Sequence, residues 1–395
     1  MGDGVILAID LGSTSFKAGV YDHRLRAVWE RSAPVRYRYG SGGRVELVDV
    51  DATLRRILPR RRDLSVIAIT SQAQTFTVRG RPFISWQDGR AVAAAARLRR
   101  RLPDFAEHCS FAEPLPALLV SQLHHAPVRR GEWVLPLPTY FVNEWIGEPV
   151  IDDNLAAMTG LYSLKLHDWW SPACGEERLP RVIPVGTVAG LTRRNRFGLP
   201  TGVPVVLAGN DQTAGAFGAR LEPNGGTLVT LGTAQVAYRV TRRLTAAGLV
   251  RGRYPDGLAY ELVADGCGGN WISWALANLR NCATPDEFFA AAAQAPKGCC
   301  GLEFDPGTGT WRGLGLHHNT ADLARSILEG LCRQLAGQVR QLTRRRRDRI
   351  WVAGGGAQRA LWRNMLAREL GQPVQRCSAS PLLGAARMAG ISFTP

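Results

Sequence analysis

The sequence contains little lysine and has no C-x-x-C pair of cysteines. Only three lysines occur, Lys17, Lys165 and Lys297, among 49 basic residues, so the basic charge is almost entirely arginine. The arginines are spread along the whole chain. This distribution argues against a dedicated nucleic-acid surface, although the formal net charge is +16. The eight cysteines lack the spacing of a zinc site.

Long apolar runs and a secretory signal are also missing. No apolar run reaches the roughly 18 residues that a membrane span requires. The start, MGDGVILAID, lacks a basic stretch followed by an apolar stretch and a cleavage site. Hydrophobic residues make up 45% of the 395, which argues against wholesale disorder. We therefore expect a cytoplasmic protein without a membrane partner and with room for two domains.

Two similar strand–turn–strand patterns occur in the two halves of the chain. A continuous apolar run at residues 5–9 predicts a strand buried on both faces, and a turn rich in Gly, Ser and Thr follows it. The same order returns at residues 227–231, so that Gly12 and Gly232 occupy equivalent places 220 positions apart. This weak repeat predicts two related domains. Two such turns facing each other would offer N–H groups and hydroxyls to phosphate.

The remaining elements are less regular. Further strands are expected at residues 28–39, 203–207 and 350–353, and helices at 271–279, 320–342 and about 361–370. The segment of roughly residues 100–200 is rich in proline and tryptophan and has no strong periodicity. Such a segment is typical of an insertion over a substrate pocket, or of ordinary connecting loops.

Five sequence motifs follow one another in a fixed order. They are ILAIDLGSTSFKAGVYD, ISWQDGRA, AGNDQTAGAFGA, TLVTLGTAQ and VAGGGAQRALWRNML, and the helix LLGAARMAG comes after them. Together they resemble the FGGY family of carbohydrate kinases, which belongs to the actin, hexokinase and Hsp70 ATPase superfamily. The resemblance implies an α/β fold of two ribonuclease-H-like domains with a cleft between them. Residues 1–220 would bind the first phosphate and the sugar, and residues 221–395 the second phosphate and adenosine.

Asp10 and Asp211 are the candidates for catalysis and metal binding. Each follows a predicted buried strand, where an aspartate can also serve as a turn or helix cap. The resemblance implies that Asp211 is the base that receives a proton from a sugar hydroxyl. It also implies that Asp10 and Asp211 hold Mg²⁺ near the phosphates of ATP.

The resemblance further implies an ATP site built mostly from glycine-rich turns. Its candidates are Asp10, Gly12, Ser13, Thr14, Lys17, Gly232, Thr233, Gly269, Ser273, Gly354, Gly355 and Gly356. Such turns bring backbone N–H groups close to phosphate, and a helix N-terminus favours the same charge. Lys17 would contact the γ-phosphate or, alternatively, is a surface residue of a strand. Each glycine set is otherwise a tight turn.

A second group of residues is expected to bind the sugar. It contains Gln74, Trp86, Gln87, Asp88 and Asp211. Amide and carboxylate groups suit vicinal hydroxyls, and an indole ring can pack on a sugar face; the alternative is a helix start with a buried tryptophan. Ala73 and Gln74 stand where glycerol kinases carry an Arg–Glu pair. The stretches WQDGR, GTAQVA and CGGNW favour a sedoheptulokinase-like or xylulokinase-like member.

We therefore expect a carbohydrate kinase that uses ATP and Mg²⁺ to phosphorylate a ketose. One alternative is a weakly active or inactive sensor that binds sugar or nucleotide. It is motivated by the segment around residues 100–200, which looks shortened, and by a chain end soon after LLGAARMAG. Another alternative is a kinase of glycerol or another polyol. The sequence leaves open which sugar and which hydroxyl react, and whether the protein forms a homodimer.

Overall fold

The computed structural model describes residues 4–78, 80–232, 234–245, 248–266, 268–342 and 348–391. Thr233 of the predicted ATP site therefore lies outside the described residues. The chain forms two compact units. The first comprises Met1–Arg220, Arg242–Tyr260 and Ala379–Pro395, and the second comprises Leu221–Thr241 and Glu261–Ser378. The first unit thus takes in two segments beyond the predicted range of 1–220, and the binding roles assigned to 1–220 and 221–395 stay predictions.

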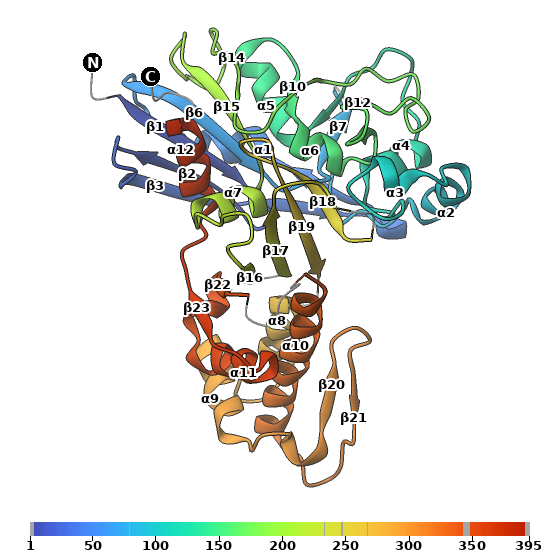
Figure 1. The fold of residues 1–395 in the computed structure, drawn as a ribbon, viewed down its shortest axis with the longest axis vertical. Helices are drawn as coiled ribbons and strands as arrows, with labels where there is room; N and C mark the ends of the chain where they lie inside the picture. Colours follow the sequence, from blue (N-terminus) through green and yellow to red (C-terminus); the bar gives the residue numbers. More distant parts are fainter. Residues whose placement is uncertain are drawn as a thin grey trace. The chain divides into compact units, whose positions relative to one another are not determined.

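A six-stranded sheet forms the centre of the first unit (Figure 1). Its strands, in spatial order, are β14 (Val188–Leu191), β15 (Pro204–Asn210), β6 (Leu64–Ser71), β1 (Val5–Leu11), β2 (Ser15–Tyr21) and β3 (Ala27–Pro34). Strand β1 pairs antiparallel with β2 and parallel with β6. The parallel pairing brings the ends of β1 and β6 to the same edge of the sheet.

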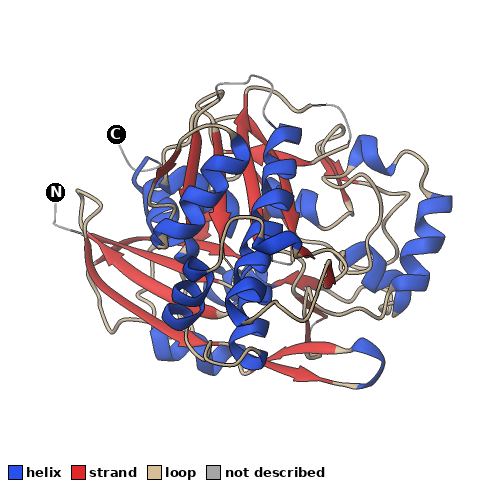
Figure 2. Ribbon diagram, turned by 90° about the horizontal axis from the view of Figure 1, so that it is seen from below, coloured by secondary structure: helices blue, strands red, loops and turns tan. Residues whose placement is uncertain are grey.

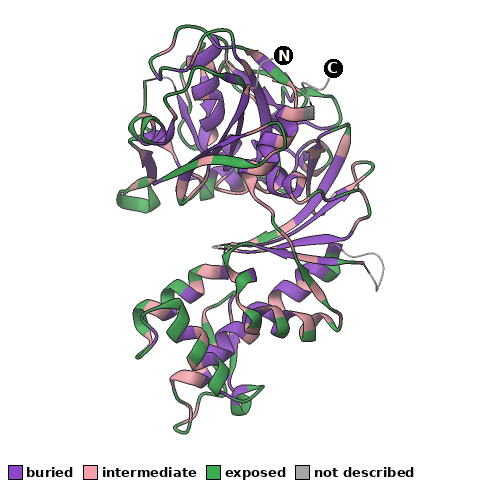
Figure 3. Cartoon of the chain, turned by 90° about the vertical axis from the view of Figure 1, so that its left-hand side faces the viewer, coloured by how far each residue is buried: buried purple, intermediate pink, exposed green. Residues whose placement is uncertain are grey.

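Helices cover both faces of this sheet, as the apolar run of β1 predicts. All seven residues of β1 are buried. Figure 3 colours the described residues by burial. Leu7 and Ile9 pack in a core with residues of α1 (Val50–Ile57) and α5 (Leu137–Ile146). Ile6 and Ala8 pack in a second core with α12 (Pro381–Ile391), which lies beside α7 (Asp211–Gly218). Because side chains alternate along a strand, the two faces of β1 are buried by different helices.

The first unit also contains a five-stranded sheet. Its order is β4 (Arg36–Tyr39), β5 (Val45–Val48), β8 (Phe83–Ile84), β7 (Phe76–Val78) and β9 (Val134–Pro136), with a 3₁₀ turn at Ser41–Gly43. The expectation of one strand over residues 28–39 is therefore wrong, since β3 and β4 belong to different sheets. The break falls after Pro34, which lacks an N–H for pairing. Val35 instead donates its N–H to the carbonyl of Thr14, at 3.2 Å.

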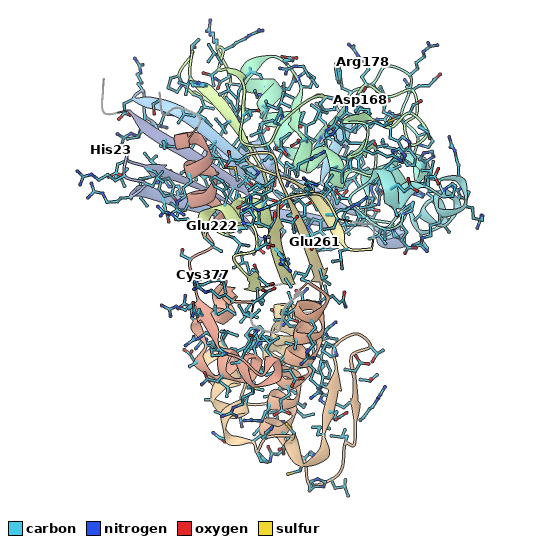
Figure 4. All side chains as sticks on the ribbon, viewed as in Figure 1. His23, Asp168, Arg178, Glu222, Glu261 and Cys377 are labelled. Atoms are coloured by element: carbon cyan, nitrogen blue, oxygen red, sulfur yellow. The ribbon has the colours of Figure 1, made fainter. Side chains whose placement is uncertain are left out.

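Short helices and strands form the rest of this unit. They are α2 (Val92–Arg101), α3 (Phe105–His108), α4 (Leu119–His125), α6 (Asp153–Met158), β10 (Val150–Asp152), β11 (Tyr162–Ser163), β12 (Asp168–Trp169), β13 (Arg181–Ile183) and β18 (Val250–Tyr254). Cation–π contacts stabilise part of this region: the guanidinium of Arg178, labelled in Figure 4, lies 4.4 Å from the ring centre of Trp133. Strand β18 packs against α6 although Asn154 and Arg253, which form a hydrogen bond between them, are 99 residues apart in the sequence.

The second unit is built around strands of a six-stranded sheet with the order β18-β19-β17-β16-β22-β23, of which β18 belongs to the first unit. The other strands are β19 (Leu258–Asp265, which begins in the first unit), β17 (Gln235–Thr241), β16 (Thr227–Leu231), β22 (Ile350–Ala353) and β23 (Val374–Arg376). Figure 2 shows helices in blue and strands in red. The helices are α8 (Gly268–Asn278), α9 (Pro285–Gln294), α10 (Thr320–Leu342) and α11 (Ala360–Leu370), with 3₁₀ turns at Cys299–Gly301 and Gly355–Gln358 and a hairpin of β20 (Glu303–Asp305) and β21 (Thr310–Arg312).

The predicted repeat is confirmed by the pairing of the strands. In the second unit β16 pairs antiparallel with β17 and parallel with β22, as β1 does with β2 and β6 in the first. Helix α10 has the predicted bounds, and Leu331 and Leu335 of its apolar face are fully buried. The expected α/β class is therefore confirmed. In the described ranges, no helix has the length and apolar character that a membrane span requires.

Candidate active site

Two aspartates and a lysine meet at one edge of the six-stranded sheet in the first unit. Asp10 lies on the same face of β1 as Ile6 and Ala8, the face that α7 and α12 cover. Lys17 is the cross-strand partner of Asp10 on β2, and its Nζ lies 3.7 Å from Oδ2 of Asp10. Asp211 is the first residue of α7. The sheet register and the start of α7 therefore bring together residues that are far apart in the sequence.

The electrostatics of this group are unusual for carboxylates. Burial, and then the negative charge of Asp211, raise the pKa of Asp10 to about 7, although Lys17 lowers it. Burial also raises the pKa of Asp211 to about 6, against the lowering effects of the Gln212 N–H and of Lys17. Oδ1 of Asp10 is buried and has no hydrogen-bond partner among the residues that the structure describes. Asp10 is buried and Asp211 is half-buried, and two neighbouring acids with one lysine favour a further cation at this place.

The turn after β1 is packed against the carboxylate of Asp10. A Cβ on Gly12 would lie 3.7 Å from each carboxylate oxygen of Asp10 and 3.0 Å from the carbonyl of Ser15. The hydroxyl of Tyr37 donates to the carbonyl of Ser13 at 2.7 Å. Gly12 and Ser13 are half-buried, and Thr14 is exposed. The first predicted phosphate turn therefore lies at the same place as the acidic pair.

The loop that carries Asp211 is tightly constrained. Gly209 has a φ of +69°, which side-chain-bearing residues rarely adopt. The side chain of Asn210 caps α7, accepting a hydrogen bond from the N–H of Thr213 at 2.8 Å. Asp211 follows this cap directly, so its backbone position is set by the start of the helix. The cap belongs to Asn210, and Asp211 itself is not the cap.

Three glycine-rich turns converge in the second unit. The N–H of Gly269, near the start of α8, donates to the carbonyl of Gly232 at 2.7 Å. A Cβ on Gly354 would lie only 2.7 Å from the carbonyl of Leu231, the last residue of β16. The turn after β22 thus packs on the turn after β16. Gly356 in turn contacts the ring of Trp362, since a Cβ there would lie 2.4 Å from it.

This arrangement brings together the predicted ATP residues Gly232, Gly269, Gly354 and Gly356, with Gly355 between the last two. Ser273 is exposed one turn further along α8. The N–H of Gly269 is already used within the protein. Contacts of this turn with a phosphate would therefore come from other groups at the N-terminus of α8, which favours anions.

The side chains of the predicted sugar residues differ in their hydrogen bonding within the protein and in their exposure. The amide of Gln74 donates to the carbonyl of Met158 and accepts from the N–H of Leu119 at 3.2 Å. Gln87 is exposed, with its Oε1 3.5 Å from the Tyr39 hydroxyl. Trp86 is half-buried. Met158 also lies near the base loop, because its sulfur is 2.9 Å from Nδ2 of Asn210. Gln74 is therefore brought close to the loop of Asp211.

Asp88 is an internal anchor in this structure. It is 1% exposed and accepts hydrogen bonds from the N–H of Val45 at 3.1 Å and from the side chain of Arg90 at 3.0 Å. Burial raises the pKa of this carboxyl, but the hydrogen bonds and charge of Arg90 outweigh burial and hold it below its ordinary value. Asp88 is thus ionised and committed to the motif that contains it. Its predicted sugar contact stays a prediction.

Two residues near the site were not singled out from the sequence. Tyr37 reaches the first turn, where its hydroxyl donates to the carbonyl of Ser13, and burial raises its pKa to about 12. Gln72 follows β6 directly, and its N–H donates to the carbonyl of Leu11 at 3.0 Å. The signal for Gln72 was available, since polar residues after parallel strands meet at one edge. Tyr37 gave no such signal, because it lies on a different sheet.

Comparison with known proteins agrees with this geometry. The model of the FGGY family of carbohydrate kinases, C-terminal domain, matches residues 266–393. A xylulose kinase of Escherichia coli is 28% identical over 354 residues, which are 80% of this chain and 72% of that protein. A glycerol kinase of Cereibacter sphaeroides is 28% identical over 457 aligned positions, covering 98% of this chain and 90% of its own.

A solved structure shares the fold over the full length. The ligand-bound xylulose kinase of Lactobacillus acidophilus superimposes with a TM-score of 0.86, covering 99% of this chain and 90% of its own, at 18% identity. This likeness identifies two domains of the actin and hexokinase ATPase fold. The family match, the order of the motifs and the fold lead to the same conclusion: residues 266–393 match the C-terminal domain of the FGGY family of carbohydrate kinases, and the chain as a whole is similar to these phosphotransferase enzymes.

Proposed function

We propose that this protein transfers the γ-phosphoryl group of ATP to a hydroxyl of a ketose similar to xylulose or sedoheptulose, with Asp211 as the base. The observation that carries the proposal is the meeting of Asp10, Lys17 and Asp211 at one sheet edge. Phosphoryl transfer requires positioning, charge neutralisation and a group that orients the nucleophile. These three side chains have the chemistry for each of those tasks.

Asp211 acts on the acceptor hydroxyl. The hydroxyl oxygen forms a bond to the γ-phosphorus while the bond to the β–γ bridging oxygen breaks, and the hydroxyl proton passes to the carboxylate of Asp211. The products are ADP and the sugar phosphate. A base with a pKa of about 6 is largely ionised at neutral pH and still accepts a proton effectively. Lys17 balances the charge of the phosphoryl group during transfer.

Asp10 and Asp211 fit a magnesium ion. Mg²⁺ prefers one or two carboxylates, with water and substrate phosphates as its other ligands. The unpartnered Oδ1 of Asp10 and the raised pKa of both carboxyls indicate a place for a cation. In the described part of the chain no three His, Cys, Asp or Glu side chains gather into a metal cluster, as expected for an ion completed by ATP. The ion would neutralise the developing phosphate charge.

The glycine-rich turns of the second unit support the binding of ATP. Kinases of this family use ATP as the phosphate donor. Gly232, Gly269 and Gly354 lie at turns whose backbones pack closely, without side chains between them. A surface of this kind lets a nucleotide approach the backbone. We assign the phosphates to Gly232 and the start of α8, and the adenosine to residues 354–356.

The neighbourhood of Gln74 supports a sugar over glycerol. Ala73 packs against a small core that contains Ile151 and Leu155, and the amide of Gln74 is bonded to backbone groups. Ala73 and Gln74 thus stand in place of the charged pair that glycerol kinases carry here. Polyols remain a second candidate because the glycerol kinase of Cereibacter sphaeroides aligns with 98% of the chain.

A substrate panel tests the proposal. ADP release with Mg-ATP is measured with xylulose, sedoheptulose, other ketoses, aldoses, polyols and glycerol. We expect release stimulated by a ketose above all others. Preference for glycerol would replace the proposed acceptor with a polyol. Tight nucleotide binding without stimulation by any acceptor would overturn the proposed activity and favour a sensor.

A further inference from the structure

The side chain of Asn154 connects three segments around the base loop. It lies in α6 and is fully buried. Its Nδ2 donates to Oγ1 of Thr213 at 2.9 Å and to the carbonyl of Arg253 at 2.6 Å. Its Oδ1 accepts the N–H of Asn210 at 3.0 Å. Both donors and one acceptor position of the amide are therefore satisfied by protein groups.

Two of these bonds lie on either side of Asp211. Asn210 precedes Asp211, and Thr213 follows it by two residues, so one side chain holds the loop at both ends. Gly209 also approaches Asn154 closely, because a Cβ at residue 209 would lie 3.0 Å from its Oδ1. A larger residue at 209 would force the loop away from Asn154. The loop and the amide therefore fit each other as a unit.

The third bond fixes Asn154 from the other side. Arg253 belongs to β18, which packs against α6 and lies far from the base loop in the sequence. The backbone carbonyl of a strand is a rigid acceptor. Asn154 therefore links the base loop to strand β18 through hydrogen bonds, and to its own short helix α6 through the backbone.

We infer that Asn154 positions the catalytic base, holding the loop of Asp211 at the place where the carboxylate meets the acceptor hydroxyl. This inference rests on the proposed function. Asn154 is a positioning residue because two of its side-chain hydrogen bonds join it to Asn210 and Thr213, which lie on either side of Asp211 in the sequence. A misplacement of about 1 Å of a reacting group can reduce a rate by about 10²-fold. The amide of Asn154 therefore contributes to catalysis without contact with substrate.

The test is a double-mutant cycle on sugar-dependent ADP release. Asn154→Ala is expected to lower kcat by about 10²-fold while the KM for the sugar changes little. In the Asp211→Ala background the same substitution is expected to have no further effect, because the group that it positions is gone. Asn195→Ala is the matched control. Among the residues that the structure describes, the side chain of Asn195 bonds to Arg193, Phe197 and Leu199 of its own loop, and kcat should stay unchanged.

Thr213 supplies a second pair of variants in case Asn154→Ala does not fold. Thr213→Ser keeps the hydroxyl that accepts from Asn154 and should retain most of the kcat. Thr213→Val keeps the shape of the side chain and removes the hydroxyl, so kcat should fall. Equal kcat values for Thr213→Ser and Thr213→Val would overturn the inference, and so would additive losses in the cycle.

A readout that does not depend on activity separates the two proposals. Amide hydrogen exchange of residues 209–213 should be faster in Asn154→Ala than in the original protein, while exchange in α10 of the second unit should not change. Unchanged protection at 209–213 would overturn the positioning role even if no acceptor were found. Faster exchange in a protein that phosphorylates no sugar would overturn only the proposed function.

Discussion

The two units place the same strand–turn–strand pattern around different chemistry. In the first unit Asp10 faces Lys17 across the strand pair, two residues before Gly12. In the second unit the equivalent position holds Thr230, which faces Val236 two residues before Gly232. An ion pair in one unit thus corresponds to an uncharged pair in the other. The repeat provides two similar backbones, and the side chains make one of them acidic.

This difference indicates that the two units have different roles in the proposed reaction. The first unit supplies titrating side chains, and burial sets their pKa values near neutrality. The second unit contains closely packed glycine turns and the N-terminus of α8, which under the proposed function would act through the backbone. Backbone groups bind phosphate without accepting protons. We expect substitutions at the first turn to change catalysis, and those at the second to change nucleotide binding.

Paired substitutions at the two equivalent positions should give the largest difference. Asp10→Asn should lower kcat by about 10²-fold or more, because a cation-binding carboxylate contributes several kcal/mol to the transition state. Thr230→Val should have a much smaller effect on kcat. Steady-state ADP release with the best sugar acceptor measures both. Equal losses in the two variants would contradict the proposed difference in roles.

Two glycines of α12 allow a matched test of packing in the first unit. A Cβ on Gly384 would lie 1.7 Å from the carbonyl of Ala214 in α7, whereas one on Gly390 would meet only Cδ1 of Ile6, at 3.9 Å. Gly384→Ala should therefore reduce the free energy of unfolding by at least about 1–3 kcal/mol. Gly390→Ala should be close to neutral.

Thermal unfolding of the two glycine variants checks this expectation. Amide exchange would locate the loss, which should fall on the six-stranded sheet of the first unit. Equal midpoints for Gly384→Ala and Gly390→Ala would show that α7 and α12 do not approach as closely as described. A loss confined to the second unit would contradict the assignment of α12 to the first.

A buried cap gives a predicted effect on stability that depends on pH. Asp152 caps α6 by accepting from the N–H of Leu155 at 2.8 Å, and burial raises its pKa from an ordinary value of 3.8 to about 7. Because the folded protein holds this proton more tightly than the unfolded chain, the contribution of Asp152 to stability is greatest below pH 3.8. It is lost as the pH rises to about 7. Asp152→Asn keeps a good cap and removes the titration.

The comparison of Asp152→Asn with the original protein requires unfolding midpoints over a range of pH. We expect the variant to gain stability relative to the original protein above about pH 7, and to lose that advantage at about pH 4. A difference that does not change with pH would indicate that Asp152 keeps an ordinary pKa. A reversed trend would indicate that its backbone hydrogen bonds outweigh its burial.

Much of the fold could be predicted because its signals are local. The apolar run at residues 5–9 and the periodicity at 320–342 depend on nearby residues alone, and both elements are present. The repeat around Gly12 and Gly232 predicted that β1 and β16 each pair with the strand that follows them in the same way. The prediction of one strand over residues 28–39 was wrong because the sheet to which a strand belongs depends on partners that are distant in the sequence. Pro34 was the local sign of the break.

In the candidate site, too, features with local signals could be predicted and distant contacts could not. Asp10 and Asp211 could be predicted because each stands at the end of a strand, and they lie close together because these parallel strands end at the same edge of the sheet. The backbone bonds of Gln74 could not be predicted, since Met158 is 84 residues away in the sequence. The network of Asn154 was also hidden, because it joins α6, α7 and β18. Sequence patterns indicate which residues end strands, but not which side chains are already bonded.

The most direct test of the account is the effect of Asp211→Asn on phosphoryl transfer, measured together with nucleotide binding. With the acceptor found in the substrate panel, we predict a fall in kcat of about 10²–10⁴-fold, typical of the loss of a general base. The Kd for ADP should stay nearly the same, because the glycine turns of the second unit are untouched. Full transfer activity in Asp211→Asn would contradict the central claim that this carboxylate receives the proton.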